Sequence, residues 1–187
     1  MKRLVAVSVD AALTTALIAA LLAAVGGSAT AVQGGGNLLR NPGFEQGDNG
    51  VWKGNPENTL TTSDPHSGAW IAYMAATGVP NRDTLFQRVT IPAGSAATLT
   101  FWLKLTTDEP VGNMDDTFEV KVTNAAGTTR THRTLTSADA TDPGVYVRHR
   151  VRLNRYLGRT VTVRFITNED QGNRTDFQLD DTALRVS

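Results

Sequence analysis

The chain has 187 residues, of which 40% are hydrophobic and 19% charged, with 18 Lys and Arg, 18 Asp and Glu, and no cysteine. Zero net charge and an isoelectric point of about 6.8 argue against a nucleic-acid-binding protein, whose domain pI usually exceeds about 9. The absence of cysteine excludes a disulfide scaffold, a thiolate zinc site and a cysteine nucleophile. The length suits one domain with a single core.

The N-terminus has the pattern of a secretory signal peptide. Lys2 and Arg3 precede the uncharged apolar run 11–25, and the small-residue triplet 29–31 follows it. The run is about 15 residues long, whereas a helix that spans a bilayer needs about 20. We therefore expect residues 1–31 to be removed and the protein to be secreted to the extracellular side, with no membrane span after cleavage. The alternative is an uncleaved membrane anchor.

The rest of the chain has the pattern of one all-β domain. We expect a flexible lead-in over 32–36 and a single β-sandwich over 37–187, because no further linker divides the chain. Hydrophobic and polar residues alternate along four segments, at 99–105, 118–122, 145–153 and 161–165. Turn-forming Pro, Gly, Asn and Asp residues separate these segments, and no long stretch keeps a period of 3.6. This pattern predicts an antiparallel β-sandwich.

Several motifs occur in a characteristic order. They are the segment NLLRNPGFEQG at 37–47, Trp52, FQRVTIPAG at 86–94, LTFWL at 99–103 and FQLDDTAL at 177–184. In this order they resemble the galactose-binding-like jelly-roll domains, which include many carbohydrate-binding modules of secreted bacterial glycosidases. Segments 106–117 and 168–177 also resemble a subgroup appended to the C-termini of secreted bacterial peptidases. The resemblance implies a jelly roll with a binding role and does not identify the ligand.

The resemblance also implies a structural calcium ion. In the jelly-roll modules, a glutamate of the NPGFE segment and an aspartate of the last strand bind it, and Glu45 and Asp180 match these positions, with Asp181 as the neighbouring possibility. Calcium takes six to eight oxygen ligands, so carboxylates suit it. Consecutive strand residues face opposite ways, so only one aspartate should point inward unless a bulge intervenes. The alternative is that Glu45 pairs with Arg185 while the aspartates cap a loop.

A second acidic group could bind a further cation. Its members are Asp108, Glu109, Asp115 and Asp116 in one loop, and Glu169, Asp170 and Asp176 near the end of the chain. Carboxylates at this density repel one another, and a cation would relieve the repulsion. Solvated loop acids are the competing interpretation.

Aromatic residues on polar strand faces are candidate sugar contacts. Trp102 lies between Thr100 and Lys104 on the polar side of its strand pattern, so we expect its indole to face away from the core. Sugar rings stack on such faces, and flanking groups such as Lys104 bond the hydroxyls. Trp70 and Tyr73 could supply a second platform. The alternatives are cover of Trp102 by a neighbouring segment and core packing for Trp70, as for Trp52.

Basic residues form another candidate surface. Arg148, Arg150 and Arg152 share one face of a predicted strand and could bind an anionic polymer such as teichoic acid or an acidic polysaccharide. The alternative is a solvated face paired with acidic neighbours.

No catalytic residue is expected. The chain has three histidines, His66, His132 and His149, and lacks the metalloprotease, nucleophile-elbow and phosphate-loop motifs. Glycoside hydrolysis would need paired carboxylates, for which Asp115 with Glu169 or Asp170 is the pair to test. We therefore predict a secreted, calcium-stabilised, noncatalytic module that binds carbohydrate or a cell-wall polymer. The alternative is a protein-interaction or stability module that contacts a secreted protein.

Overall fold

The computed structural model describes residues 36–140 and 144–187. The predicted signal peptide and residues 32–35 of the predicted lead-in lie outside this part of the chain. Within it, no helix has the length and apolarity needed to cross a membrane.

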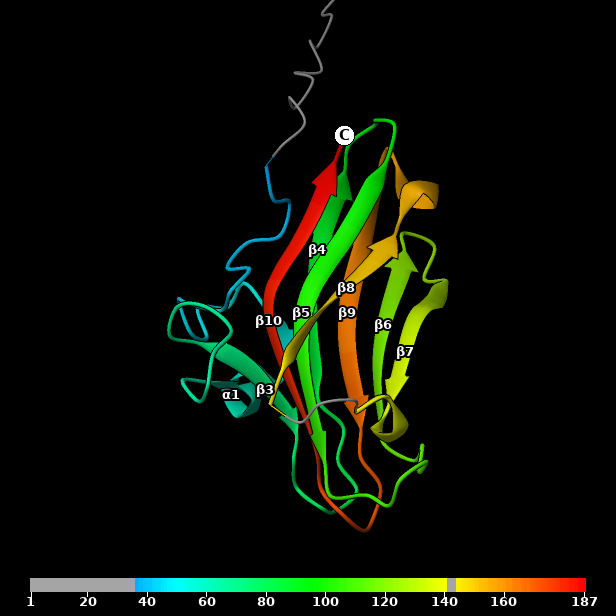
Figure 1. Cartoon of the computed structure of the whole chain (residues 1–187). Coiled ribbons are helices and arrows are strands. Elements are labelled where there is room, and N and C mark those ends of the chain that lie inside the picture. The colour runs from blue at the N-terminus through cyan, green and yellow to red at the C-terminus, as the bar shows by residue number, and fades with distance from the viewer. Residues whose placement is uncertain (1–35, 141–143) are drawn as a thin grey trace, which may run out of the picture. The chain divides into compact units, whose positions relative to one another are not determined.

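Two five-stranded sheets make up the fold, and every strand pair in them is antiparallel (Figure 1). The first sheet has the order β1 (Lys53–Gly54), β4 (Thr84–Ile91), β9 (Arg159–Asn168), β6 (Thr117–Asn124), β7 (Thr129–Thr136). The second sheet has the order β2 (Leu60–Thr61), β3 (Ile71–Ala75), β10 (Thr175–Val186), β5 (Ala97–Thr107), β8 (Tyr146–Arg152). The described helices are short: α1 (Pro56–Thr59), η1 (Ser137–Asp139) and η2 (Asn154–Tyr156). The predicted antiparallel β-sandwich is confirmed.

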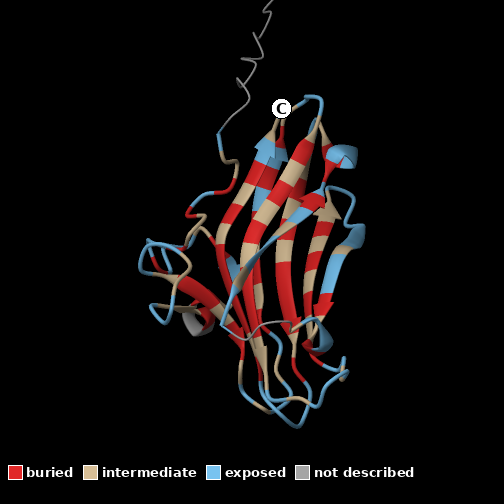
Figure 2. Cartoon of the chain, in the orientation of Figure 1, coloured by how far each residue is buried: buried red, intermediate tan, exposed pale blue. Residues whose placement is uncertain are grey.

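Alternating burial along the strands places the core between the two sheets. Figure 2 shows bands of buried residues along the central strands. The inward-facing sets predicted within 99–105, 118–122 and 161–165 are confirmed, since their hydrophobic members are buried. Side chains of adjacent strand residues point to opposite faces, so the polar members of the same strands point outward.

Aromatic side chains fill the centre of the core. Phe118 lies with its ring centroid 5.7 Å from that of Phe101, 5.9 Å from Phe165 and 5.9 Å from Phe177. Trp52 is 1% exposed and donates its indole N–H to the Asn41 carbonyl at 2.8 Å, so its predicted core role is confirmed. Buried aromatic rings at these separations contribute about 0.5–1.5 kcal/mol per pair beyond their burial.

The edge strand β8 departs from the prediction. Its alternation is correct, but Val145 and Val147 are 47% and 44% exposed, while Val151 and Leu153 are buried. Alternation decides which way a side chain points, whereas burial also needs a layer that faces it. At the edge of the sandwich this layer is incomplete.

The strand β7 has no counterpart among the predicted segments. Its sequence TRTHRTLT carries a single buried hydrophobic residue, Leu135. Because β7 pairs with β6 alone and forms the edge of its sheet, pairing rather than a hydrophobic face defines it.

Candidate functional site

The outward surface of the second sheet collects most of the predicted ligand contacts, and we call it the outer face. Strand register places Tyr73, Gln178, Lys104 and Tyr146 in one row across β3, β10, β5 and β8. Asp180, Trp102 and Arg148 form the next row. Asp176 and Thr106 stand on the other side of the first row.

A loop covers part of the outer face. The segment 62–70, which joins β2 to β3, is called here the covering loop. Its His66 ring stacks on Trp102 with centroids 4.1 Å apart and planes 20° apart. Its Asp64 forms an ion pair with Lys104 and accepts a hydrogen bond from the Tyr146 hydroxyl through its carbonyl at 2.9 Å. Trp102 is thus half-buried under an imidazole, and Lys104 is buried.

The three predicted calcium ligands hold the same loop. Buried Asp180 accepts hydrogen bonds from the backbone N–H groups of 66 and 67 at 3.0 and 3.1 Å. Asp181 contacts the His66 ring nitrogen Nδ1 at 2.6 Å and accepts from the Ser67 hydroxyl at 2.9 Å. Glu45 accepts from the N–H groups of 69 and 70 at 2.9 and 3.2 Å. The structure therefore brings Glu45, Asp180 and Asp181 together at one loop.

A β-bulge explains how two consecutive aspartates reach the same place. The pairing of β10 with β5 shifts register between Asp180 and Ala183, and Asp181 has a φ of 45°. This left-handed residue breaks the alternation, so both carboxylates turn toward the covering loop. Burial raises the pKa of Asp180 to about 6, because its charged form loses hydration.

Two carboxylates beside Gly43 suit a hard cation. A Cβ atom on Gly43 would lie 3.4 Å from Asp181 Oδ1 and 3.7 Å from Asp180 Oδ1, so these two carboxylates face one point of the backbone, where the nearest Glu45 atom is the methylene carbon Cγ at 3.8 Å. The ligand atoms that lie within 4.8 Å of one another belong to His66, Asp180 and Asp181. Carboxylate oxygens are calcium ligands, whereas the His66 nitrogen is not one that calcium prefers.

Tyr73 stands at the centre of a polar group on the uncovered part of the outer face. Its hydroxyl donates to Asp176 Oδ2 at 2.6 Å and accepts from Arg174. Arg174 Nε donates to Asp176 Oδ1 at 2.6 Å, and Thr106 Oγ1 donates to Asp176 Oδ2 at 3.3 Å. Burial, followed by the bond to Asp176, raises the pKa of Tyr73. We call Tyr73, Arg174 and Asp176 the Tyr73 group.

Two polar hollows flank the Tyr73 group. One encloses about 440 Å³ and is lined by Thr106, Thr107, Asp108, Arg174 and Asp176. The other encloses about 310 Å³ and is lined by Thr59, Thr61, Ser63 and Tyr73. Beside Tyr73 in the strand register lies Gln178, which is 6% exposed and whose Oε1 has no hydrogen-bond partner among the described residues.

The other predicted contacts lie apart from the Tyr73 group. Trp70 packs against the core. Its ring would lie 3.4 Å from a Cβ atom on Gly47, so the indole covers the turn at Gly47. Arg148, Arg150 and Arg152 are exposed on the edge strand β8, opposite Trp102, Thr100 and Thr98, and form no ion pair with a described carboxylate. Sequence patterns missed Arg174 and placed Asp176 in the second acidic group rather than beside Tyr73, although the outward alternation of Asp176 with Gln178 was a usable signal.

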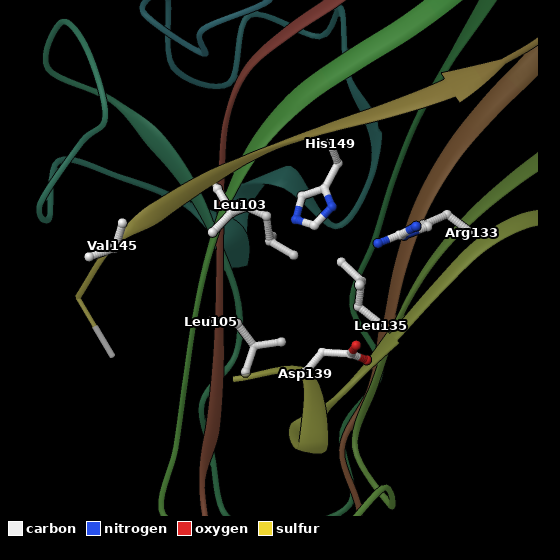
Figure 3. A pocket seen from close by; sticks show the side chains of 8 residues that line it. Leu103, Leu105, Arg133, Leu135, Asp139, Val145 and His149 are labelled. Atoms are coloured by element: carbon white, nitrogen blue, oxygen red, sulfur yellow. The ribbon is translucent and has the colours of Figure 1, made fainter. Parts of the chain in front are cut away.

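An apolar crevice opens between the edge strands β7 and β8 (Figure 3). It encloses about 190 Å³, and its lining combines aliphatic side chains with three ionisable ones: Leu103, Leu105, Leu135, Val145, Val147, Arg133, Asp139 and His149. The ring of His149 stacks on Phe101 at 5.2 Å. Burial, followed by the charge of Arg133, lowers the pKa of His149.

The histidines form no catalytic arrangement among the described residues. Asp181 binds both Ser67 and His66, whereas a triad needs the histidine between the hydroxyl and the carboxylate. His132 contacts the Tyr156 hydroxyl at 2.9 Å. Glu169, a member of the carboxylate pair considered for hydrolysis, is 5% exposed and accepts bonds from backbone N–H groups.

Comparison with known proteins is informative at the level of structure. No sequence family matches the chain, and no curated protein matches it. A family 61 carbohydrate-binding module solved with β-1,4-galactotriose superposes with a TM-score of 0.61 at 19% identity, over 82% of this chain and 100% of that one. A non-crystalline-cellulose-specific family 28 module gives 0.52 at 13% identity, over 81% and 97%. The K3 cleaved adhesin domain of Lys-gingipain from Porphyromonas gingivalis gives 0.54 at 17% identity, over 80% and 98%.

These likenesses concern the fold, because each identity is below 25%. They confirm the fold expected from the motif order, in its similarity both to carbohydrate-binding modules and to the adhesin domain of Lys-gingipain. The chain therefore has the β-sandwich fold that these binding modules and this adhesin domain share.

Proposed function

We propose that the protein is a secreted, noncatalytic module that binds carbohydrate or a cell-surface polymer, and that calcium stabilises it. The observation that carries the proposal is the Tyr73 group, a partly exposed aromatic ring between two polar hollows and beside an arginine–aspartate pair. The carbohydrate-binding modules of the same fold support it.

The Tyr73 group suits the chemistry of a sugar. Each sugar hydroxyl donates and accepts hydrogen bonds, and each ring has an apolar C–H surface. Arg174 supplies donors, Asp176 and the unpartnered Oε1 of Gln178 supply acceptors, and the Tyr73 ring supplies a rigid apolar surface. Binding sites of this kind combine one apolar surface with a few placed polar groups.

Trp102 has an indirect role in this proposal. Its indole supports His66, and Lys104 holds Asp64, so both residues position the covering loop whose Ser63 lines one of the hollows. The Tyr73 group therefore replaces Trp102 as the best contact candidate. Arg148, Arg150 and Arg152 of the edge strand β8 would add affinity for anionic polymers.

Calcium would be held by Glu45, Asp180 and Asp181. When bound, it would neutralise the three carboxylates and so stabilise the attachment of the covering loop to β10.

The test is retention of the secreted protein, in calcium buffer, on insoluble polysaccharides and purified cell walls. We expect Tyr73→Ala to reduce retention at least tenfold and Tyr73→Phe, which keeps the ring, to reduce it less. Arg88→Ala, an exposed change on the other sheet, is the control and should bind like the wild type. Thermal melts establish that each variant is folded. Failure of the wild type to bind any polymer would refute the carbohydrate proposal.

A second candidate is a protein-interaction module. The observation that favours it is the apolar crevice beside exposed Val145 and Val147, since exposed apolar surface often marks a contact site. Chemical crosslinking in culture supernatant tests this candidate. A specific partner should be lost on Val147→Glu and retained on Tyr73→Ala.

A further inference from the structure

The β5–β6 and β9–β10 loops lie at the end of the sandwich far from the C-terminus (Figure 1). Three carboxylates from these two loops meet. Glu109 and Asp116 belong to the β5–β6 connection, and Asp170 belongs to the β9–β10 connection. One carboxylate oxygen from each lies within 4.8 Å of the others. This distance is compatible with a single ion that touches all three, since calcium binds its oxygen ligands at about 2.3–2.6 Å.

Asp116 supplies an independent indication of a ligand. Its side chain is 0% exposed, and Oδ1 accepts a hydrogen bond from the Asp170 N–H at 2.9 Å. The other oxygen, Oδ2, is buried and has no hydrogen-bond partner among the described residues. A buried carboxylate oxygen without a partner is costly and rare, so a group that completes its coordination is expected there.

The charge around the cluster is not balanced by the protein. None of the three carboxylates forms an ion pair with a described lysine or arginine. The cluster therefore lacks a positive charge that a cation would provide.

The surroundings orient Glu109 and leave room near the cluster. Asn113 and Asn173 donate amide hydrogens to Glu109 Oε2 at 2.7 and 3.4 Å. Gly172 lies alongside, where a Cβ atom would be 3.7 Å from Glu109 Oε1 and 3.8 Å from Asp170 Oδ1. The second oxygen of Glu109 thus remains available for a ligand.

We propose that Glu109, Asp116 and Asp170 bind a calcium ion, separate from the one considered at Glu45. The cluster contains only oxygen ligands, which suit hard cations and exclude the soft sites of copper or zinc. Irregular loops supply the ligands, and calcium accepts such variable geometry, whereas magnesium requires a nearly ideal octahedron. The ion would join the β5–β6 loop to the β9–β10 loop beside the hollow lined by Asp108 and Arg174.

The experiment counts calcium ions in the purified protein. Metal-free protein is titrated with CaCl₂ by isothermal titration calorimetry, and bound calcium is measured by elemental analysis after desalting. The main variant is Asp170→Asn, because Asp170 is exposed and its amide analogue should fold. Asp48→Asn, an exposed change outside the cluster and outside both hollows, is the control.

We expect Asp170→Asn to bind one calcium fewer per chain than its parent, both alone and in a Glu45→Gln background. Asp48→Asn should bind as many as the wild type. Melting temperatures give a second readout. Added calcium should raise that of the Glu45→Gln parent, and Asp170→Asn should abolish this rise. Equal calcium content with and without Asp170→Asn would overturn the proposal, whatever the Glu45 site or the polysaccharide assay shows.

Discussion

Glu169 offers a stringent test of the forces that hold the loops of the sandwich. It lies just after β9, is 5% exposed, and gathers four donors on one carboxylate. Thr77 donates its N–H at 2.8 Å and its hydroxyl at 2.5 Å, Gly78 donates its N–H at 2.9 Å, and Thr175 donates its N–H at 3.3 Å. We predict that Glu169→Ala detaches the 77–78 loop and destabilises the whole domain.

The magnitude follows from what each donor can do without the carboxylate. Thr77 is exposed and Gly78 half-buried, so both can bond to water, and each loses only the net value of its bond. Thr175 is 0% exposed, so its N–H stays unsatisfied at a cost of about 1–3 kcal/mol. With about 1 kcal/mol for each of the three remaining bonds, the expected loss is about 4–6 kcal/mol. For a domain of this size, that lowers Tm by roughly 8–24 °C.

The assay is urea and thermal unfolding in excess chelator, which separates Glu169 from the neighbouring carboxylate cluster. Glu169→Gln keeps one acceptor oxygen and should lose about half as much as Glu169→Ala. Asp48→Ala removes an exposed carboxylate that accepts a single hydrogen bond from Gly50, and it should change stability by less than about 1 kcal/mol. A Glu169→Ala protein within 1 kcal/mol of the wild type would refute the argument.

Three further predictions use other parts of the molecule. Calcium at about 100 times its dissociation constant should stabilise the protein by roughly 2.7 kcal/mol per site, and Glu45→Gln should remove the stabilisation that comes from one site. If calcium raised the Tm of this variant as much as that of the wild type, the result would contradict the Glu45 site. Because burial lowers the pKa of His149 below 6.5, its neutral form stabilises the protein above that pH, and this stability is lost as pH falls through 6.5. His149 lies beside Arg133 and Asp139, and we expect His149→Phe to lose less stability to urea than the wild type between about pH 7 and pH 5. Equal losses in the two proteins would argue against a buried neutral imidazole. Gly54→Ala should lower the Tm far more than Gly127→Ala does. The new Cβ would lie 1.8 Å from a backbone oxygen in the first variant and would meet nothing within 4 Å in the second. Comparable Tm values would show that the backbone yields.

Local pattern in the sequence predicted the fold class well. Strands such as β5 and β6 were readable because alternating hydrophobic residues mark a face that must be buried. The same pattern correctly assigned Trp102 to the outward side of β5. The expected core packing of Trp52, which lies outside the alternating segments, is also confirmed. It could not find β7, whose edge position requires backbone pairing but little hydrophobic surface.

The tertiary structure decided what covers each outward side chain and which distant carboxylates meet. Alternation places Trp102 outside, yet a segment some 36 positions earlier in the chain stacks His66 on it. The bulge after Asp180 depends on pairing with β5 and turns Asp181 toward the same loop. Hydrogen-bond geometry joins Tyr73 to Asp176 on β10 and to Arg174 just before that strand. A sequence pattern reports the direction of a side chain along its own strand, whereas cover, coordination and charge balance depend on segments that only folding brings into contact.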